Sequence, residues 1–215
     1  MVILVLSCDK NEDLWYPFHY CIEKYWKNHP KVIYKSETKE NPYYHTLLAN
    51  YPLEIWSKGI RECLKQIKDN RVLIMVDDVF IREPVNEKRL QYVLDNFRGA
   101  SINFEKAFPY DIDTDLEGVK LHPKGCQFEV SIMCALWDRN SLIKVLSEDY
   151  DPWSIEIRNN GYGMDFYINS GEPIINWGYT FGKWFGIQKG KWCKEALDFF
   201  RKEGVEIDYD KRGFV

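Results

Sequence analysis

Two acidic residues, Asp77 and Asp78, directly follow the apolar run 72–76, VLIMV. A strand that ends there holds both carboxylates at its exit, where they repel each other unless a cation keeps both ionised. A hard divalent ion such as Mn²⁺ or Mg²⁺ prefers oxygen ligands, and with only one or two carboxylates it keeps positions for water and substrate phosphates. The pattern therefore predicts a metal–diphosphate site. The alternative is an ordinary helix N-cap or turn.

A tryptophan and a carboxylate lie three residues apart in the segment 152–156, PWSIE. The ring of Trp153 is a suitable platform for the apolar face of a sugar. Glu156 has the chemistry to accept a proton from an attacking hydroxyl. The alternative interpretation is a buried tryptophan beside a surface glutamate.

Two other segments carry features suited to an anion. Lys183, Lys189 and Lys191 lie in a glycine-rich stretch, FGKWFGIQKGKW, where mobile basic side chains would stabilise a negatively charged leaving group. Ser57 stands at the predicted start of a helix, where a serine caps the helix and exposed backbone amides bind anions. A solvated basic loop and a plain helix cap are the respective alternatives.

Several other chemistries find no support in the sequence. The histidines lack the HxH and HExxH spacings of zinc hydrolases, and the six cysteines form no CxxC pair. GxSxG, a GxGxxG after the first strand and a P-loop are also missing. The net charge of −4 disfavours nucleic acid as a partner, and no apolar run approaches the roughly 18–20 residues of a membrane helix. We therefore expect a cytoplasmic protein with free thiols. Its 16% share of aromatic residues fits a ring-rich core and also a surface that stacks on sugars or bases.

Hydrophobic periodicity predicts strands alternating with helices, with no repeat and no flexible linker. Strands are predicted at residues 2–6, 31–35, 71–76, 100–104 and 128–135. Helices are predicted at 14–26, 55–67, 85–97, 138–146 and 192–203, the last ended by Gly204. Residues 36–50 are predicted as a loop, 105–125 as a loop or hairpin, and 147–190 as irregular. This alternation predicts an α/β fold with a mostly parallel, Rossmann-like central sheet flanked by helices.

Ligands of such sheets bind outside the carboxyl ends of the strands. Two polar clusters fall at that edge, residues 7–11 after the first strand and the Asp77–Asp78 pair after the third. The elements therefore place both clusters where a ligand is expected.

Taken together, these segments resemble small bacterial glycosyltransferases with the nucleotide-sugar-binding GT-A fold, a group from surface-polysaccharide and glycoprotein gene clusters. The resemblance spans nearly the whole chain. It is carried by VILVLSCDKNEDLW, WSKGIRECLKQI, VLIMVDDVFI, SIMCALWDRNSLIKVL with DPWSIEI, and GKWCKEALDFFRKEGVEI. It implies one domain over residues 1–215, with a nucleotide-sugar-binding half (1–104) and an acceptor-side half (105–215).

The resemblance also implies roles for individual residues. The acidic motif of GT-A enzymes is usually DxD, so in the VDD of this chain Asp78 takes the metal-binding position and Asp77 the middle one. Glu156 falls where inverting members place their catalytic base, and Asp77 is expected to be catalytic as well. The nucleotide-binding residues are Ser7, Cys8, Asp9, Trp56, Ser57 and Asp77, together with Lys189 and Lys191 of the glycine-rich stretch. The acceptor-side residues are Trp137, Asp151 and Trp153.

The sequence thus predicts a metal-assisted, inverting hexosyltransferase. The donor is a nucleotide-diphosphate sugar, with UDP-sugar expected from the family, and the acceptor is a saccharide or glycoprotein. A homo-oligomer, or a place within a larger enzyme, is compatible with the short chain. Two other functions stay open: a carbohydrate-binding or inactive transferase-like module, and a glycoside hydrolase with paired carboxylates.

Overall fold

The computed structural model describes residues 1–104, 111–126, 129–157, 162–177 and 185–215. Within these ranges the central sheet has nine strands in the order β3-β2-β1-β4-β8-β5-β9-β7-β6. They are β1 (Val2–Leu6), β2 (Val32–Ser36), β3 (His45–Leu48), β4 (Arg71–Val76), β5 (Ser101–Asn103), β6 (Ile112–Asp113), β7 (Val119–Leu121), β8 (Ala135–Asp138) and β9 (Phe166–Asn169). A separate hairpin pairs β10 (Ile187–Gln188) with β11 (Lys191–Trp192).

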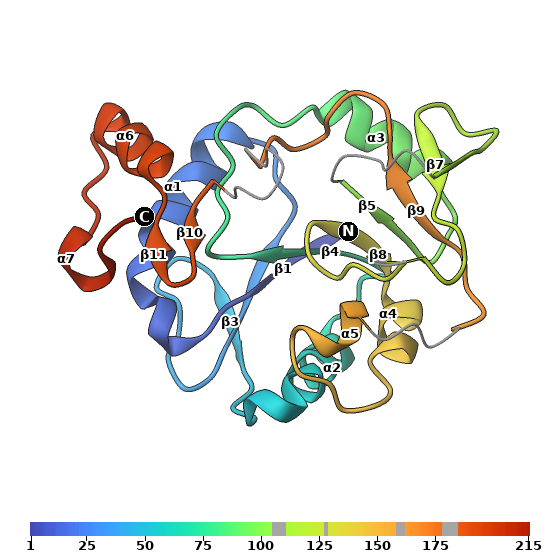
Figure 1. The fold of residues 1–215 in the computed structure, drawn as a ribbon, viewed down its shortest axis with the longest axis horizontal. Coiled ribbons are helices and arrows are strands. Elements are labelled where there is room, and N and C mark those ends of the chain that lie inside the picture. The colour runs from blue at the N-terminus through green and yellow to red at the C-terminus, as the bar shows by residue number, and fades with distance from the viewer. Residues whose placement is uncertain (105–110, 127–128, 158–161, 178–184) are drawn as a thin grey trace.

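Helices cover both faces of the sheet (Figure 1). Every residue of β1 is buried, which explains its unbroken apolar run. Ile3 and Val5 share a core with α1 (Trp15–Tyr25), α3 (Glu87–Asn96) and α6 (Lys194–Glu203), and Val2 and Leu4 share the opposite core with α2 (Trp56–Gln66) and α4 (Arg139–Val145). The shorter helices are η1 (Asp9–Leu14), η2 (Leu53–Ile55), α5 (Ser154–Ile157) and α7 (Tyr209–Arg212). Within the described ranges, no helix has the length and apolarity to cross a membrane.

Most strands of the sheet run in one direction, which confirms the predicted fold class. β3, β2, β1 and β4 are mutually parallel, and β8 is antiparallel to both of its neighbours, β4 and β5. β9 is parallel to β5, and β7 reverses direction before β6. The β1–β2 connection passes through α1 on one face of the sheet, and the β3–β4 connection passes through α2 on the opposite face. The strand order therefore reverses between β1 and β4, which makes this position a topological switch point. Ligands bind at such switch points in α/β sheets.

Three predicted segments differ from the structure. The predicted loop 36–50 contains the edge strand β3, and the predicted irregular segment 147–190 contains β9. The predicted strand 128–135 is wrong over the described residues 129–134, because pairing with β4 and β5 begins only at Ala135, while Phe128 lies outside the described residues. Segment 105–125 does contain a hairpin, β6–β7, and Gly204 ends α6 in the left-handed conformation at φ 68°, as predicted.

Candidate functional site

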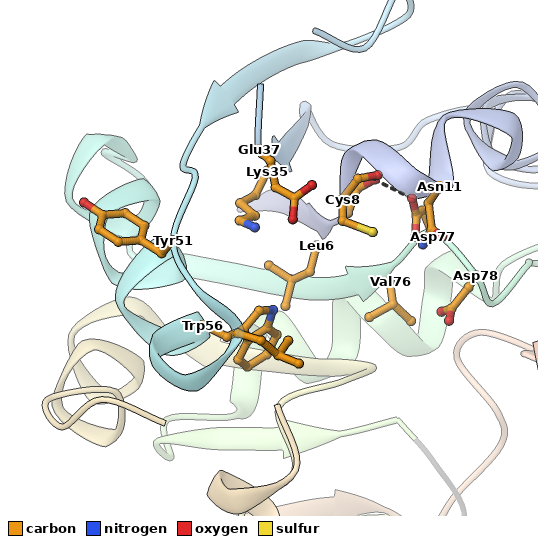
Figure 2. Close-up of a pocket in the computed structure, with 13 residues that line it drawn as sticks. Leu6, Cys8, Asn11, Lys35, Glu37, Tyr51, Trp56, Val76, Asp77 and Asp78 are labelled. Atoms are coloured by element: carbon orange, nitrogen blue, oxygen red, sulfur yellow. Dashed lines mark hydrogen bonds between the residues drawn. The ribbon is translucent and has the colours of Figure 1, made fainter. Parts of the chain in front are cut away.

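A pocket opens at the carboxyl ends of β1, β2 and β4, at the switch point of the sheet (Figure 2). It encloses about 280 Å³. The residues that follow β1 and β4 form one end, and the start of α2 forms the other. Five of the predicted site residues line it: Ser7, Cys8, Trp56, Asp77 and Asp78. The fold therefore brings the two polar clusters together with the start of α2 around one space.

Asp77 is buried and held by a chain of hydrogen bonds. Ser7 Oγ donates to Asp77 Oδ2 at 2.5 Å, and Asn11 Nδ2 donates to Oδ1 at 2.8 Å. Trp15 Nε1 in turn donates to Ser7 Oγ at 2.8 Å, which fixes the serine. Burial and the charge of Asp78 raise the pKa of Asp77 to about 8, although both hydrogen bonds act in the opposite direction. Asp77 is thus a positioned group with both oxygens engaged.

Asp78 is the more accessible carboxylate of the pair and lies at the far end of the pocket from Tyr51 (Figure 2). Burial raises its pKa. Its backbone carbonyl accepts a hydrogen bond from Ile187 N at 2.9 Å, so the β10–β11 hairpin is attached directly behind it. Gly186 has φ 153°, and a Cβ built there lies 2.0 Å from the Asp78 carbonyl oxygen. This close approach requires glycine.

Arg212, near the end of the chain, supplies a cation beside the acidic pair. Its Nε donates to Asp13 Oδ2 at 2.6 Å, and one terminal nitrogen donates to Asp13 Oδ1 at 2.8 Å and to Asn11 Oδ1 at 3.0 Å. Its positive charge counteracts the rise in the pKa of both Asp77 and Asp78 that burial causes. The sequence analysis missed Arg212, because no local spacing connects it to the acidic pair.

The predicted nucleotide-contacting residues after β1 divide into two groups. Ser7 and Cys8 face the pocket, and burial raises the pKa of the Cys8 thiol. Asp9 faces away, toward the turn after β2, where it accepts hydrogen bonds from Ser36 Oγ at 2.8 Å and from Thr38 N at 3.0 Å. Burial acts to raise the pKa of Asp9, but these bonds outweigh it and the pKa is lowered. Asp9 therefore shapes the pocket wall through the turn that it holds.

Trp56 and Ser57 are neighbours with different environments. Trp56 is the first residue of α2 and lines the pocket, whereas Ser57 is buried. Ser57 does not cap the helix as predicted: its Oγ donates to Glu148 O at 3.1 Å and accepts from Tyr150 N at 2.8 Å. It fixes the segment before α5 against α2. The cap prediction failed because η2 leads directly into α2, and Ile55 takes the N-cap position.

The predicted basic residues lie on the β10–β11 hairpin. Lys189 and Gly190 form its turn with positive φ values of 50° and 80°, and Lys189 and Lys191 are exposed. The hairpin starts next to Asp78, but these lysines do not line the pocket. Lys183 lies outside the described residues.

The predicted acceptor-side residues separate into surface and core. The side chain of Trp153 is 64% exposed at the start of α5, and Asp151 caps this helix by accepting from Ser154 N at 2.9 Å. Glu156 is half-buried, accepts from Ser131 Oγ at 3.4 Å, and has a pKa raised by burial. Trp137 is 0% exposed in the core, so its ring faces are not available to a saccharide in this structure.

Comparisons with known proteins identify a similar fold but no family for this chain. The sequence matches no protein-family model and no curated protein. A CMP:2-keto-3-deoxy-manno-octonic acid synthetase complexed with CTP is similar in structure, with a TM-score of 0.50 and 9% identity over 78% of this chain and 88% of that one. The bifunctional IspDF of Campylobacter jejuni has a TM-score of 0.48 and 13% sequence identity over 80% of this chain. This chain covers 50% of the length of IspDF. The galactosyltransferase LgtC, in complex with donor and acceptor sugar analogues, has a TM-score of 0.44 and 11% sequence identity over 72% of this chain and 69% of that one. The likeness to the synthetase establishes a shared Rossmann-like α/β fold.

Proposed function

We propose that this chain is a transferase that binds a nucleotide-diphosphate sugar with a divalent metal ion and moves the sugar to a saccharide or glycoprotein hydroxyl. The observation that carries the proposal is the acidic pair, Asp77 and Asp78, which leaves a central strand inside a pocket at the switch point. Trp56 also lines this pocket, and its ring is a candidate surface on which a nucleobase could stack. The solved structure of similar fold that is complexed with CTP supports nucleotide binding at this kind of sheet.

The donor set fits a metal ion that binds together with substrate phosphates. Among the described residues, no group of three or more His, Cys, Asp or Glu side chains could hold a metal ion. Asp78, however, is half-buried and lines the pocket, and ions such as Mg²⁺ are commonly held by one or two carboxylates plus phosphate oxygens. A metal ion bound there would neutralise negative charge on the diphosphate. Arg212 supplies a second, permanent positive charge close by.

Glu156 is the proposed base in the transfer step. The acceptor oxygen forms a bond to the anomeric carbon, the bond from that carbon to the diphosphate oxygen breaks, and its electron pair leaves with the diphosphate. The hydroxyl proton passes to the Glu156 carboxylate, whose raised pKa makes it a better base near neutral pH. Trp153 offers an exposed ring for the acceptor sugar. Attack from the side opposite the leaving group inverts the anomeric configuration.

The binding half of the proposal is tested by calorimetry with nucleoside diphosphates, each with and without Mn²⁺. We expect binding only with the metal, and a loss of at least tenfold in Asp78→Asn. The matched control is Asp95→Asn, the same change at an exposed carboxylate on α3. Saccharide binding that is indifferent to both metal and nucleotide would instead support a carbohydrate-binding module.

The catalytic half is tested by analysing the products of turnover. A glycosyltransferase releases nucleoside diphosphate, a nucleotidyltransferase of similar fold would release pyrophosphate, and a glycoside hydrolase would act without nucleotide. We expect Glu156→Gln to lower the transfer rate by about 10²–10⁴-fold while the melting temperature stays near that of the wild type. The matched control, Glu54→Gln, changes an exposed carboxylate and should keep full activity.

A further inference from the structure

Two segments that pack together bring Ser131 next to the proposed base, Glu156. Ile155 of α5 is buried in the core on the α2 side of the sheet, together with Val130 and Ile132 of the segment before β8. Ser131 lies between these two anchored residues and is less buried than either. Its Oγ donates to Glu156 Oε1 at 3.4 Å. The contact therefore joins two elements that the core holds in place.

The carboxylate of Glu156 is stabilised by two donors from the segment before β8. Ser131 Oγ is one, and the backbone amide of Ile132 is the other. Both act to lower the pKa of Glu156, but burial acts in the opposite direction and prevails, so the pKa is raised. Within the described ranges, no charged side chain contributes to this balance. The protonation of Glu156 is thus governed by burial and by these two donors.

The hydroxyl of Ser131 suits both protonation states of the base, which a backbone amide does not. An ionised carboxylate only accepts hydrogen bonds, whereas a protonated one also donates, and a serine hydroxyl does either by rotating. When Glu156 takes the proton of the acceptor hydroxyl, Ser131 can turn from donor to acceptor. The N–H of Ile132 can only donate. Ser131 can therefore hold the carboxyl group throughout the proton transfer.

We propose that Ser131 is a positioning residue for Glu156, which orients the carboxyl group before and after it accepts the proton. This inference rests on the proposed function, in which Glu156 is the base. The helix itself has another support, because Asp151 Oδ1 accepts from Trp153 N and Ser154 N at 2.9 Å each. Loss of the Ser131 hydroxyl should thus alter the base and leave α5 in place.

The first test is an NMR titration of the Glu156 side-chain carboxyl carbon, which needs no substrate. Ser131→Ala removes a donor to the charged form, so the titration midpoint should rise by about 0.5–1 pH unit. Ser131→Thr keeps the hydroxyl and should keep the wild-type midpoint. The matched control is Ser147→Ala, the same change at an exposed serine after α4, which should leave the midpoint unchanged.

The second test is the pH profile of the transfer reaction. The value of kcat/KM should fall below the pKa of Glu156, because the protonated group cannot act as a base. In Ser131→Ala this acid limb should move to higher pH together with the NMR midpoint, and kcat should fall by about 5–10-fold. Ser131→Thr should restore both. If Ser131→Ala does not fold, Ser131→Cys gives the same comparison, since a thiol is only a weak donor.

The outcomes separate this inference from the proposed function. If Glu156→Gln lowers the transfer rate but Ser131→Ala leaves kcat unchanged, the positioning role is wrong and the proposed function stands. A loss of activity that accompanies a fall in melting temperature, and that Ser131→Thr does not restore, also overturns it, because Ser131 would then be only structural. Full activity of Glu156→Gln overturns both the base and its positioning residue.

Discussion

Arg212 and Asp13 form a buried ion pair that attaches α7 to the segment after β1. The side chains are 5% and 9% exposed, and two nitrogens of the guanidinium contact both carboxylate oxygens. Removal of one partner of a buried pair costs about 3–5 kcal/mol, because the other charge stays buried alone. Lys211 also donates to Asp13, at 2.7 Å, so we expect the carboxylate to keep one cation when Arg212 is replaced. We therefore expect Arg212→Met to lower the free energy of unfolding by about 3 kcal/mol, the lower end of that range.

Urea unfolding measures this loss directly. With a slope of about 2 kcal/mol per molar urea, the midpoint should fall by about 1.5 M. The double variant Asp13→Leu/Arg212→Met removes both charges and should regain most of the stability, since apolar replacements of buried pairs are often neutral. Arg201→Met breaks an exposed pair with Asp198 on α6 and should cost about 1 kcal/mol or less. A loss below about 1 kcal/mol in Arg212→Met, with additive effects in the double variant, would refute the reasoning.

Three further predictions follow from other contacts. The pKa of Asp77 is about 8 in the folded protein and about 4 in the unfolded chain. The metal-free protein should therefore lose stability as the pH rises from about 4 to about 8. Asp77→Asn should remove this loss from the pH profile of urea unfolding. Gly186→Ala places a methyl group against the Asp78 carbonyl, so it should lower the free energy of unfolding by about 1–3 kcal/mol and weaken the proposed metal-dependent binding of nucleotide. If neither effect is measured, the hairpin shifts freely and the close approach is not required. Ser57→Ala removes the acceptor of the hydrogen bond from Tyr150 N and should lower the free energy of unfolding by about 1–3 kcal/mol, as measured by thermal unfolding. It should also make the segment before α5 more sensitive to proteases. Unchanged protease sensitivity would show that Ser57 does not hold this segment.

The strands of the sheet were predictable where burial on both faces demands a continuous apolar run, as in β1 and β4. β3 was not predictable, because it is an edge strand in which only Leu47 is buried. The predicted strand before Ala135 has a different cause. Val130 and Ile132 alternate with less buried neighbours and pack into the core, so they carry a strand-like pattern although their backbone is not paired. Periodicity reports burial, and burial does not require pairing.

The candidate site also contains residues that the sequence predicts and residues that it does not predict. The position of Asp77 and Asp78 at a strand exit was predictable, because two carboxylates directly follow a buried apolar run in the sequence, and both line the pocket. Lys35 also lines the pocket but gave no such signal, since nothing in the sequence shows that a lysine near the end of β2 faces a pocket. Trp137 shows the converse. A tryptophan near a predicted acceptor segment is attractive in sequence, but the central position of β8 encloses it.

Asn11 connects the two halves of this polar arrangement, because its amide has a different partner at each end. Nδ2 donates to Asp77 and Oδ1 accepts from Arg212, so neither atom can rotate without breaking a bond. The position of α7 is thereby transmitted through Asn11 to the carboxylate of Asp77, although α7 and Asn11 lie at opposite ends of the sequence. It follows that restoring stability with Asp13→Leu/Arg212→Met need not restore nucleotide binding. The double variant repairs the buried charge of Asp13, but it leaves the Asn11 amide without the partner that orients it and the acidic pair without its fixed cation.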